Sequence, residues 1–277
     1  MKFKATILCE NCVLGNEGAV AEHGWSIFIE TNQGNFLFDT GQGKSIINNA
    51  QFFKTDLSTT KAIMLSHHHS DHTGGLLDVL SVTGPVDVIA HPELFKESFH
   101  IQEKQKTRYI GIPFRRSVLE SKGARFKFNT TWQEIVPELS LTGEIPRITD
   151  FEKGDKDLVI RKGTQFEQDL IMDDQSLVLE TKRGLYIILG CAHSGIINIL
   201  EYAIKKTGQD HICAIIGGTH LGLVGKEQQQ KSIEALKKYD IDYIGVSHCT
   251  GLKTSMVLAQ EFGEKFFFCN VGTVIEA

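Results

Sequence analysis

Short apolar runs separated by polar turns dominate the first third of the chain and predict a strand-rich fold. These runs cover residues 3–8, 25–30, 35–39, 62–65 and 86–90. The segment Asn32-Gln33-Gly34-Asn35 separates the second run from the third and predicts a hairpin turn. Residues 75–80 follow the fourth run and predict the first turns of a helix.

The second half of the chain alternates between predicted strands and predicted helices. The strands are expected at residues 176–180, 185–189, 212–216, 243–246 and 265–269, and the helices at residues 195–206, 226–239 and 252–261. Within the second helix Ile233, Leu236 and Tyr239 lie three apart and share one face. Early hairpins followed by strand–helix units predict an α+β fold in which helices cover mixed sheets.

Residues 92–157 do not follow either pattern, since they hold four of the five prolines and few apolar runs apart from a short strand predicted at 124–128. We interpret them as an insertion in a single domain that spans residues 1–277, and such insertions often carry substrate specificity. The basic residues of this segment are Lys104, Lys106, Arg108, Arg115 and Arg116. They form either a solvated surface or a phosphate-binding lid, because guanidinium groups fit phosphate oxygens.

Composition and charge narrow the class of protein. The chain has 277 residues, 41% of them hydrophobic, and its 29 basic and 34 acidic side chains give a net charge of −5. These values argue against disorder and against a general nucleic-acid binder, which is usually basic. No apolar run reaches the length of a membrane span, and the first residues predict a strand rather than a signal peptide. We therefore expect a cytoplasmic protein, no membrane partner, and six cysteines that remain free thiols.

A histidine cluster directly after the fourth apolar run gives the clearest chemical indication. His67, His69, Asp71 and His72 form the pattern H-x-H-x-D-H. His67 and His69 are two residues apart, so at a strand end both project to one side and reach one ion at about 2.0–2.1 Å. Asp71 and His72 lie on the following turn, where a second ion is expected. The alternative is a polar loop with a chance run of histidines. His68 faces the opposite way and is not expected to be a ligand.

Three further histidines follow predicted strands of the second half: His193, His220 and His248. Strand carboxyl ends are where open α/β sheets place their sites, so these side chains are expected to join the cluster. Imidazole and carboxylate ligands suit a divalent metal, with Zn²⁺ favoured and Fe or Mn as alternatives. Cys191 and Cys249 stand beside these histidines and are interpreted as small packing residues.

With these motifs the chain resembles the metallo-β-lactamase superfamily over nearly its whole length. The resemblance implies an αββα sandwich of two mixed sheets flanked by helices. It also implies that His67, His69 and His193 bind one metal ion, and that Asp71, His72 and His248 bind a second. Asp39, in Phe38-Asp39-Thr40-Gly41, matches a strand-end motif whose Asp orients a ligand histidine, although a turn Asp before glycine is an equal interpretation.

One position departs from the family pattern. The family usually has a bridging Asp where this chain has Gly217-Gly218-Thr219-His220. Each imidazole nitrogen offers a single lone pair, so His220 cannot bridge as a carboxylate does. His220 is therefore expected either to bind one metal terminally or to act as an acid or base, and occupancy by two ions is left open.

A narrower resemblance is carried by Glu22-His23-Gly24-Trp25-Ser26, Gly190-Cys191-Ala192-His193 and Ser247-His248-Cys249-Thr250. These segments are similar to a branch that includes dihydropterin ribofuranosylaminobenzene-phosphate synthases and many metal-dependent hydrolases. In that branch His23 and Glu22 are expected to approach the site. A capped turn is the alternative role of His23.

These observations predict a metal-dependent hydrolase in which activated water attacks a small anionic substrate, a phosphorylated compound or an ester. Asp71 would hold the second metal and orient the water, and His220 or His23 would protonate the leaving group. Three alternatives remain: a transferase that uses a dihydropterin diphosphate, a non-catalytic metal- or ligand-binding sensor, and a mononuclear iron oxygenase.

Overall fold

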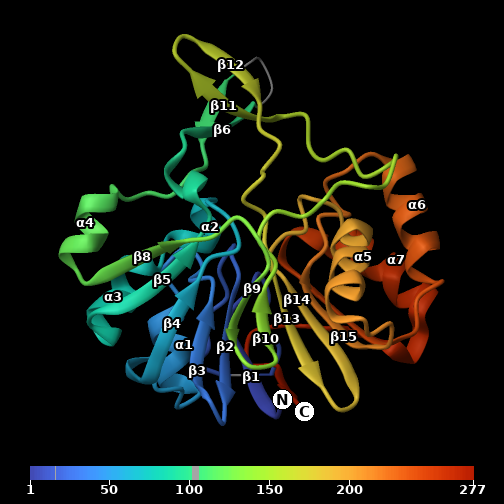
Figure 1. Cartoon of the computed structure of the whole chain (residues 1–277), viewed down its shortest axis with the longest axis horizontal. Coiled ribbons are helices and arrows are strands. Elements are labelled where there is room, and N and C mark those ends of the chain that lie inside the picture. Colours follow the sequence, from blue (N-terminus) through green and yellow to red (C-terminus); the bar gives the residue numbers. More distant parts are fainter. Residues whose placement is uncertain (16, 102–105) are drawn as a thin grey trace.

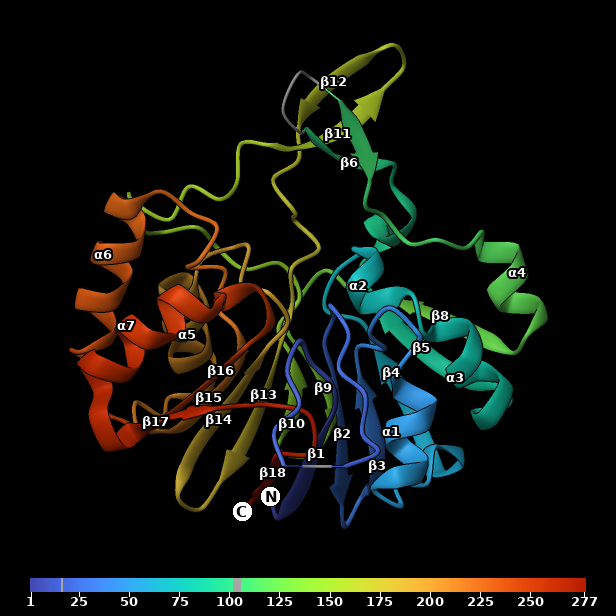
Figure 2. The ribbon, with the colours of Figure 1, turned by 180° about the vertical axis from the view of Figure 1, so that it is seen from behind.

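Two large mixed β-sheets pack face to face, and helices cover the outer face of each sheet (Figures 1 and 2). The computed structural model describes residues 1–15, 17–101 and 106–277. Lys104 of the predicted basic set lies outside the described residues. The αββα sandwich expected from the sequence is confirmed.

The first sheet has seven strands among the described residues, in the order β18-β1-β2-β3-β4-β5-β8. Its strands are β1 (Phe3–Cys9), β2 (Ser26–Thr31), β3 (Gly34–Phe38), β4 (Thr60–Met64), β5 (Val86–Ala90), β8 (Ala124–Phe128) and β18 (Val274–Glu276). β2 and β3 pair antiparallel from Ile27↔Phe38 to Thr31↔Gly34, which confirms the predicted hairpin.

The second sheet also has seven strands in the described part of the chain, in the order β17-β16-β15-β14-β13-β10-β9. Its strands are β9 (Gln133–Val136), β10 (Leu139–Leu141), β13 (Ser176–Thr181), β14 (Gly184–Leu189), β15 (Ile212–Gly218), β16 (Ile241–Ser247) and β17 (Phe266–Phe268). A third, four-stranded sheet contains β6 (Ser98–Ile101), β7 (Thr107–Tyr109), β11 (Leu158–Lys162) and β12 (Gln165–Gln168). The small sheet projects from one end of the sandwich, opposite the two termini (Figure 1).

Helices α1 (Ile46–Phe52), α3 (Leu76–Thr83) and α4 (Arg116–Ser121) lie outside the first sheet. Helices α5 (Ile196–Thr207), α6 (Lys226–Leu236) and α7 (Leu252–Phe262) lie outside the second, and the short α2 (Ser70–Thr73) stands above the first sheet. α6 ends three residues earlier than predicted, and the Tyr239 hydroxyl bonds Glu201 outside the helix. No helix of the described residues is long and apolar enough to cross a membrane.

The central strands have apolar residues at consecutive positions because both of their faces are buried. In β3, Phe36 and Phe38 enter the core between the two sheets, whereas Leu37 packs beneath the helices of the first sheet. In β14, Tyr186 and Ile188 face the same central core, and Ile187 faces α5. Each fully buried side chain of this size contributes about 1.5–3 kcal/mol, so three stacked cores hold the sandwich together.

Parallel pairing brings the chemically active loops to one edge. β4 pairs parallel with β3 and β5, and β15 pairs parallel with β14 and β16. β1 runs antiparallel to β2, and β2 runs antiparallel to β3, so β1 also points toward this edge. The loops after β1, β3, β4, β14, β15 and β16 therefore meet at one end of the sandwich.

Residues 92–157, predicted as an insertion, contribute to all three sheets: β6 and β7 to the small sheet, β8 to the first, and β9 and β10 to the second. The single-domain arrangement with an insertion stays a prediction. All six cysteines are free thiols, as expected, and five of them are buried.

Candidate metal centre

The loop after β4 and the loop after β14 bring three predicted ligands together. His67 Nε2 lies 3.0 Å from His69 Nδ1, and the His193 ring centroid lies 4.8 Å and 4.9 Å from the centroids of those two rings. All three side chains are buried. This arrangement places the predicted ligands of the first ion around one point.

A second group lies beside the first. Asp71 Oδ2 is 3.2 Å from His248 Nε2, and His72 Nε2 is also 3.2 Å from His248 Nε2. Burial alone would raise the pKa of Asp71, but hydrogen bonds from His23 and His248 hold that pKa well below its usual value. A carboxylate and two imidazoles thus converge where the second ion is expected.

Asp39 orients one histidine in each group. Its Oδ2 accepts hydrogen bonds from His72 Nδ1 (2.7 Å) and from Ser66 Oγ (2.6 Å). Because the Ser66 hydroxyl donates to Asp39, its oxygen accepts from His67 Nδ1 at 2.8 Å. In this arrangement both histidines carry their proton on Nδ1 and keep the Nε2 lone pair free. This is the geometry that the orienting role of Asp39 requires, and that role stays a prediction.

The loop after β1 orients His248, and sequence reasoning missed this. Asn11 Oδ1 lies 3.0 Å from His248 Nδ1, so it accepts that proton, and Glu10 Oε1 accepts the His248 backbone N–H at 2.7 Å. Both residues follow a strand whose carboxyl end meets the site. The strand-end rule used for the histidines would have found them.

His23 reaches the second group from the surface, since its side chain is 59% exposed and its Nε2 lies 3.1 Å from Asp71 Oδ2. Glu22, expected to approach the site with it, instead turns to the loop after β3. Its carboxylate accepts the backbone N–H groups of Gln42, Gly43 and Lys44.

His220 lies on the side of the first group. Its ring centroid is 4.2 Å from that of His193, and its Nε2 lies 3.8 Å from Asp155 Oδ2. Burial opposes protonation of His220, but Asp155 and Cys249 raise its pKa to about 9. Asp155 was not singled out from the sequence, because it lies near the end of the predicted insertion at residues 92–157 and follows no predicted strand.

His68 faces away from both groups, as predicted. Asp173 Oδ2 accepts from His68 Nδ1 at 2.8 Å and from the His68 backbone N–H at 2.7 Å, and Lys96 Nζ contacts Asp173 Oδ1 at 2.9 Å. Burial raises the pKa of Asp173, but His68 and Lys96 outweigh it and lower the pKa well below the usual value. This buried cluster anchors the loop that carries His67 and His69.

Backbone conformation adds a further indication of function. Asp39, Ala192, His220 and His248 have φ angles of 59°, 57°, 56° and 52°. Such angles are uncommon for residues other than glycine and are maintained when surrounding structure compensates for the strain. All four lie at strand ends around the two groups, which indicates that the site geometry is imposed by the fold.

A cavity of about 290 Å³ opens over both groups. The small sheet and the segments next to it form one wall, with His100, Arg108, Ile110 and Leu158 among the lining residues. The opposite part of the lining comes from the loops that carry the candidate ligands and includes His69, Asp71, His193, His220 and His248. A compact substrate in this cavity would contact both the candidate ligands and the Arg108 guanidinium.

The donor set fits a divalent cation. Burial, helped by neighbouring histidines, holds the pKa values of His67, His69 and His193 well below the usual value, so these rings are neutral. Among the described residues, His69 Nε2 and both ring nitrogens of His193 are buried without a hydrogen-bond partner. Buried polar atoms rarely stay unpartnered, and inward-facing nitrogen lone pairs are satisfied by a metal ion.

Several known proteins are similar to this chain over most of its length. A family model described as the metallo-beta-lactamase superfamily matches residues 19–248. The chain is 29% identical over 283 residues to the 7,8-dihydropterin-6-methyl-4-(beta-D-ribofuranosyl)-aminobenzene-5'-phosphate synthase of Methanocaldococcus jannaschii, covering 99% of this chain and 96% of that protein. It is 30% identical over 258 residues to an uncharacterized protein of the same organism, covering 92% and 93%. A crystal structure described as a metal-dependent hydrolase of the beta-lactamase superfamily superposes with a TM-score of 0.85 at 26% identity, covering 99% of each chain.

Proposed function

The chain belongs to the metallo-beta-lactamase superfamily, and from that premise we propose that it is a two-metal enzyme that hydrolyses a small phosphorylated substrate. The observation that carries the proposal is one cavity lined by two adjoining ligand groups and by a guanidinium. Arg108 lies on the wall opposite the ligands, where a phosphate group of the substrate would meet it.

Each side chain has a defined part in this proposal. His67, His69 and His193 would hold one ion, and Asp71, His72 and His248 would hold the other. A divalent ion held there would lower the pKa of a bound water to about 7 and would polarise the phosphoryl oxygen. His220 and Asp155 both line the cavity, with His220 Nε2 3.8 Å from Asp155 Oδ2. His220 donates the proton to the leaving group, and the exposed His23 exchanges that proton with solvent. Zn²⁺ is the favoured ion, since histidines dominate the ligands.

A second candidate is group transfer from a dihydropterin diphosphate. It is favoured by the 29% identity to a pterin-related synthase, because that likeness extends over 99% of this chain. In this reaction an aromatic nucleophile would attack the methylene carbon of the dihydropterin, and the bond to the diphosphate would break. The same cavity, with its ions bound, would hold the departing diphosphate, so the two candidates share the site and differ in the nucleophile.

Product analysis on metal-saturated protein separates the candidates. Release of inorganic phosphate from phosphomonoesters supports hydrolysis. Release of pyrophosphate from a hydroxymethyl-dihydropterin diphosphate only when an arylamine ribose phosphate is present supports transfer. If neither product forms with any divalent metal, the enzymatic proposal is wrong and a binding or sensing role takes its place.

Arg108→Ala tests the substrate class, with Arg115→Ala as the matched control because Arg115 is exposed and does not line the cavity. A charge-assisted hydrogen bond is worth about 1.5–3 kcal/mol, so KM should rise about tenfold or more in the first variant and stay unchanged in the second. An equal KM in both variants would contradict a role for Arg108 in phosphate binding.

A further inference from the structure

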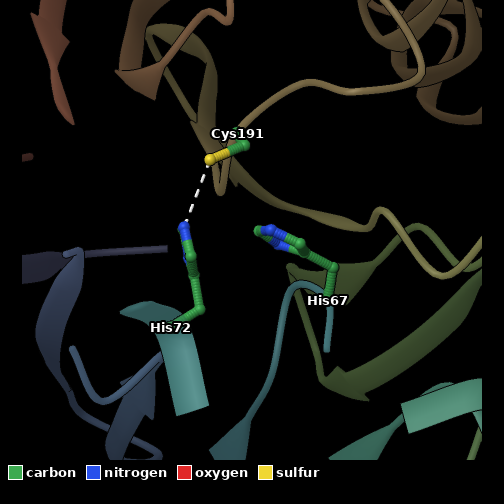
Figure 3. A group of neighbouring side chains, drawn as sticks. All are labelled: His67, His72 and Cys191. Carbon is green, nitrogen blue, oxygen red and sulfur yellow. Dashed lines mark hydrogen bonds between the residues drawn. The ribbon is translucent and has the colours of Figure 1, made fainter. Parts of the chain in front are cut away.

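The loop after β14 carries a second inward-facing donor besides His193. Cys191 is 3% exposed and lines the cavity. Figure 3 shows its side chain directed at His72, with the His67 ring alongside. The distance from Cys191 Sγ to His72 Nε2 is 3.1 Å. That nitrogen carries the free lone pair of His72, because Asp39 holds the proton on the other side of the ring.

The Cys191 sulfur adjoins ligands of both expected ions. Its Sγ falls within 4.8 Å of donor atoms in three separate groups: with His67 and His72, with His193 and His220, and with His248 and Cys249. His67 and His193 belong to the first ion, and His72 and His248 to the second. The sulfur therefore lies between the two ligand groups.

The Cys191 sulfur is better suited to bridge two metal ions than the His220 imidazole is. A bridge needs a donor atom with more than one lone pair, which a thiolate sulfur has and an imidazole nitrogen lacks. His220 stands where sequence reasoning expects the bridging position, but the structure puts its ring beside His193 and Asp155. The fold thus places a sulfur donor at the centre of the site from another strand end.

The backbone holds the Cys191 loop close to the first sheet. A Cβ on Gly190 would lie 2.3 Å from Ser66 Oγ, so only glycine allows this approach to the residue that links Asp39 and His67. Ala192 has a φ of 57°, which lets Cys191 and His193 both face inward from neighbouring positions. Sequence reasoning took Cys191 for a packing residue because residue type alone does not reveal this orientation.

We propose that Cys191 Sγ is a metal ligand shared by the two ions, in place of the family's bridging carboxylate. The inference rests on the two-metal site of the proposed function. It makes the site softer than an all-nitrogen and oxygen site and favours zinc or iron over manganese. Cys249, whose Sγ lies 3.5 Å from the Cys191 carbonyl oxygen, is the competing sulfur donor.

X-ray absorption at the zinc edge, with metal content measured on the same samples, tests this directly. A shared sulfur gives about one sulfur neighbour per zinc at about 2.3 Å with two ions bound, and a terminal sulfur gives about half of that. Cys191→Ser should abolish the sulfur shell, whereas Cys249→Ser should keep it. Cys213→Ser, a buried cysteine of β15 distant from the ligand groups, is the control and should also keep it.

Several outcomes overturn the inference. They are a wild-type spectrum without sulfur, a shell at half strength, a shell lost in equal parts from the two cysteine variants, or one bound ion per chain. The wild-type measurement stands even if a variant does not fold. Turnover of phosphate substrates is measured on the same samples: sulfur ligation without turnover contradicts only the proposed function, and turnover without sulfur ligation contradicts only the role of Cys191.

Discussion

Asp39→Asn should weaken both metal positions while leaving the backbone undisturbed. Asp39 is fully buried and has a φ of 59°, a conformation that asparagine tolerates as well as aspartate does. Its Oδ1 accepts the buried Ser66 backbone N–H at 2.7 Å. The asparagine oxygen must stay there, so the amide nitrogen takes the place of Oδ2, where it can only donate.

The substitution changes the protonated nitrogen of two histidines, because Asp39 bonds His72 directly and His67 through Ser66. At the Oδ2 position, 2.7 Å from His72 Nδ1, a donated proton forces His72 to carry its own proton on Nε2, which removes the lone pair for the second ion. On the other branch Ser66 Oγ loses its acceptor and turns its hydrogen toward His67 Nδ1, with the same effect on the first ion. Loss of an orienting partner of this kind costs about 10–100-fold in metal affinity, or about 1.4–2.7 kcal/mol.

Competition with a chromophoric chelator measures both binding steps. Asp39→Asn should weaken both steps about 10–100-fold, and Ser66→Ala should weaken only the first ion, because it leaves the bond between Asp39 and His72 intact. Asp87→Asn changes an exposed Asp paired with Arg125 and should alter neither step. Unchanged affinity for both ions in a folded Asp39→Asn protein would refute the tautomer argument.

Three further predictions concern the residues around the site. Asp173→Asn should cost about 3 kcal/mol of unfolding free energy at pH 7, because it breaks a buried charged cluster. His68 and Lys96 lower the pKa of Asp173 below its unfolded value, so this stability exists above about pH 4 and is lost as the pH falls. The gap between wild-type and variant melting temperatures should therefore close in acid. Glu152→Ala should cost about 2–4 kcal/mol in chemical denaturation, because the carboxylate accepts the N–H groups of Ile197 and Asn198 at the start of α5, and an unchanged midpoint would contradict this. His220→Ala should lower kcat about 10²–10⁴-fold with the metal content unchanged by elemental analysis, and a loss of one ion would make His220 a ligand instead.

The sequence was most informative where residues typical of metal ligands follow the end of a predicted strand. The candidate ligand histidines follow apolar runs, so the residue pattern alone places the H-x-H-x-D-H cluster, His193, His220 and His248 at one edge of the fold. Asp39 could be proposed from its strand-end motif. The two large sheets followed from uninterrupted apolar runs, which indicate strands buried on both faces.

The features that the sequence did not reveal depend on partners that are distant along the chain. Asn11 meets His248 across 237 residues, and Asp173 meets His68 across 105. The small sheet pairs β6 with β11, whose first pair joins Leu158 to His100. Such pairings leave no local pattern in the sequence. Each partner has the sequence of an ordinary polar loop or a short strand, and only the folded structure shows the contact.

The division of the ligands between the two sheets has a mechanical consequence. His67, His69, Asp71 and His72 come from the first sheet, and His193 and His248 from the loops of the second, so each ion position draws on both halves of the sandwich. With the proposed ligands, a bound ion would therefore act as a reversible cross-link where the two halves meet. At a free metal concentration 100 times the dissociation constant, such a cross-link adds about 2.7 kcal/mol of stability. With these residues as ligands, the supply of metal would set how firmly the two halves are held together at the end that carries the cavity.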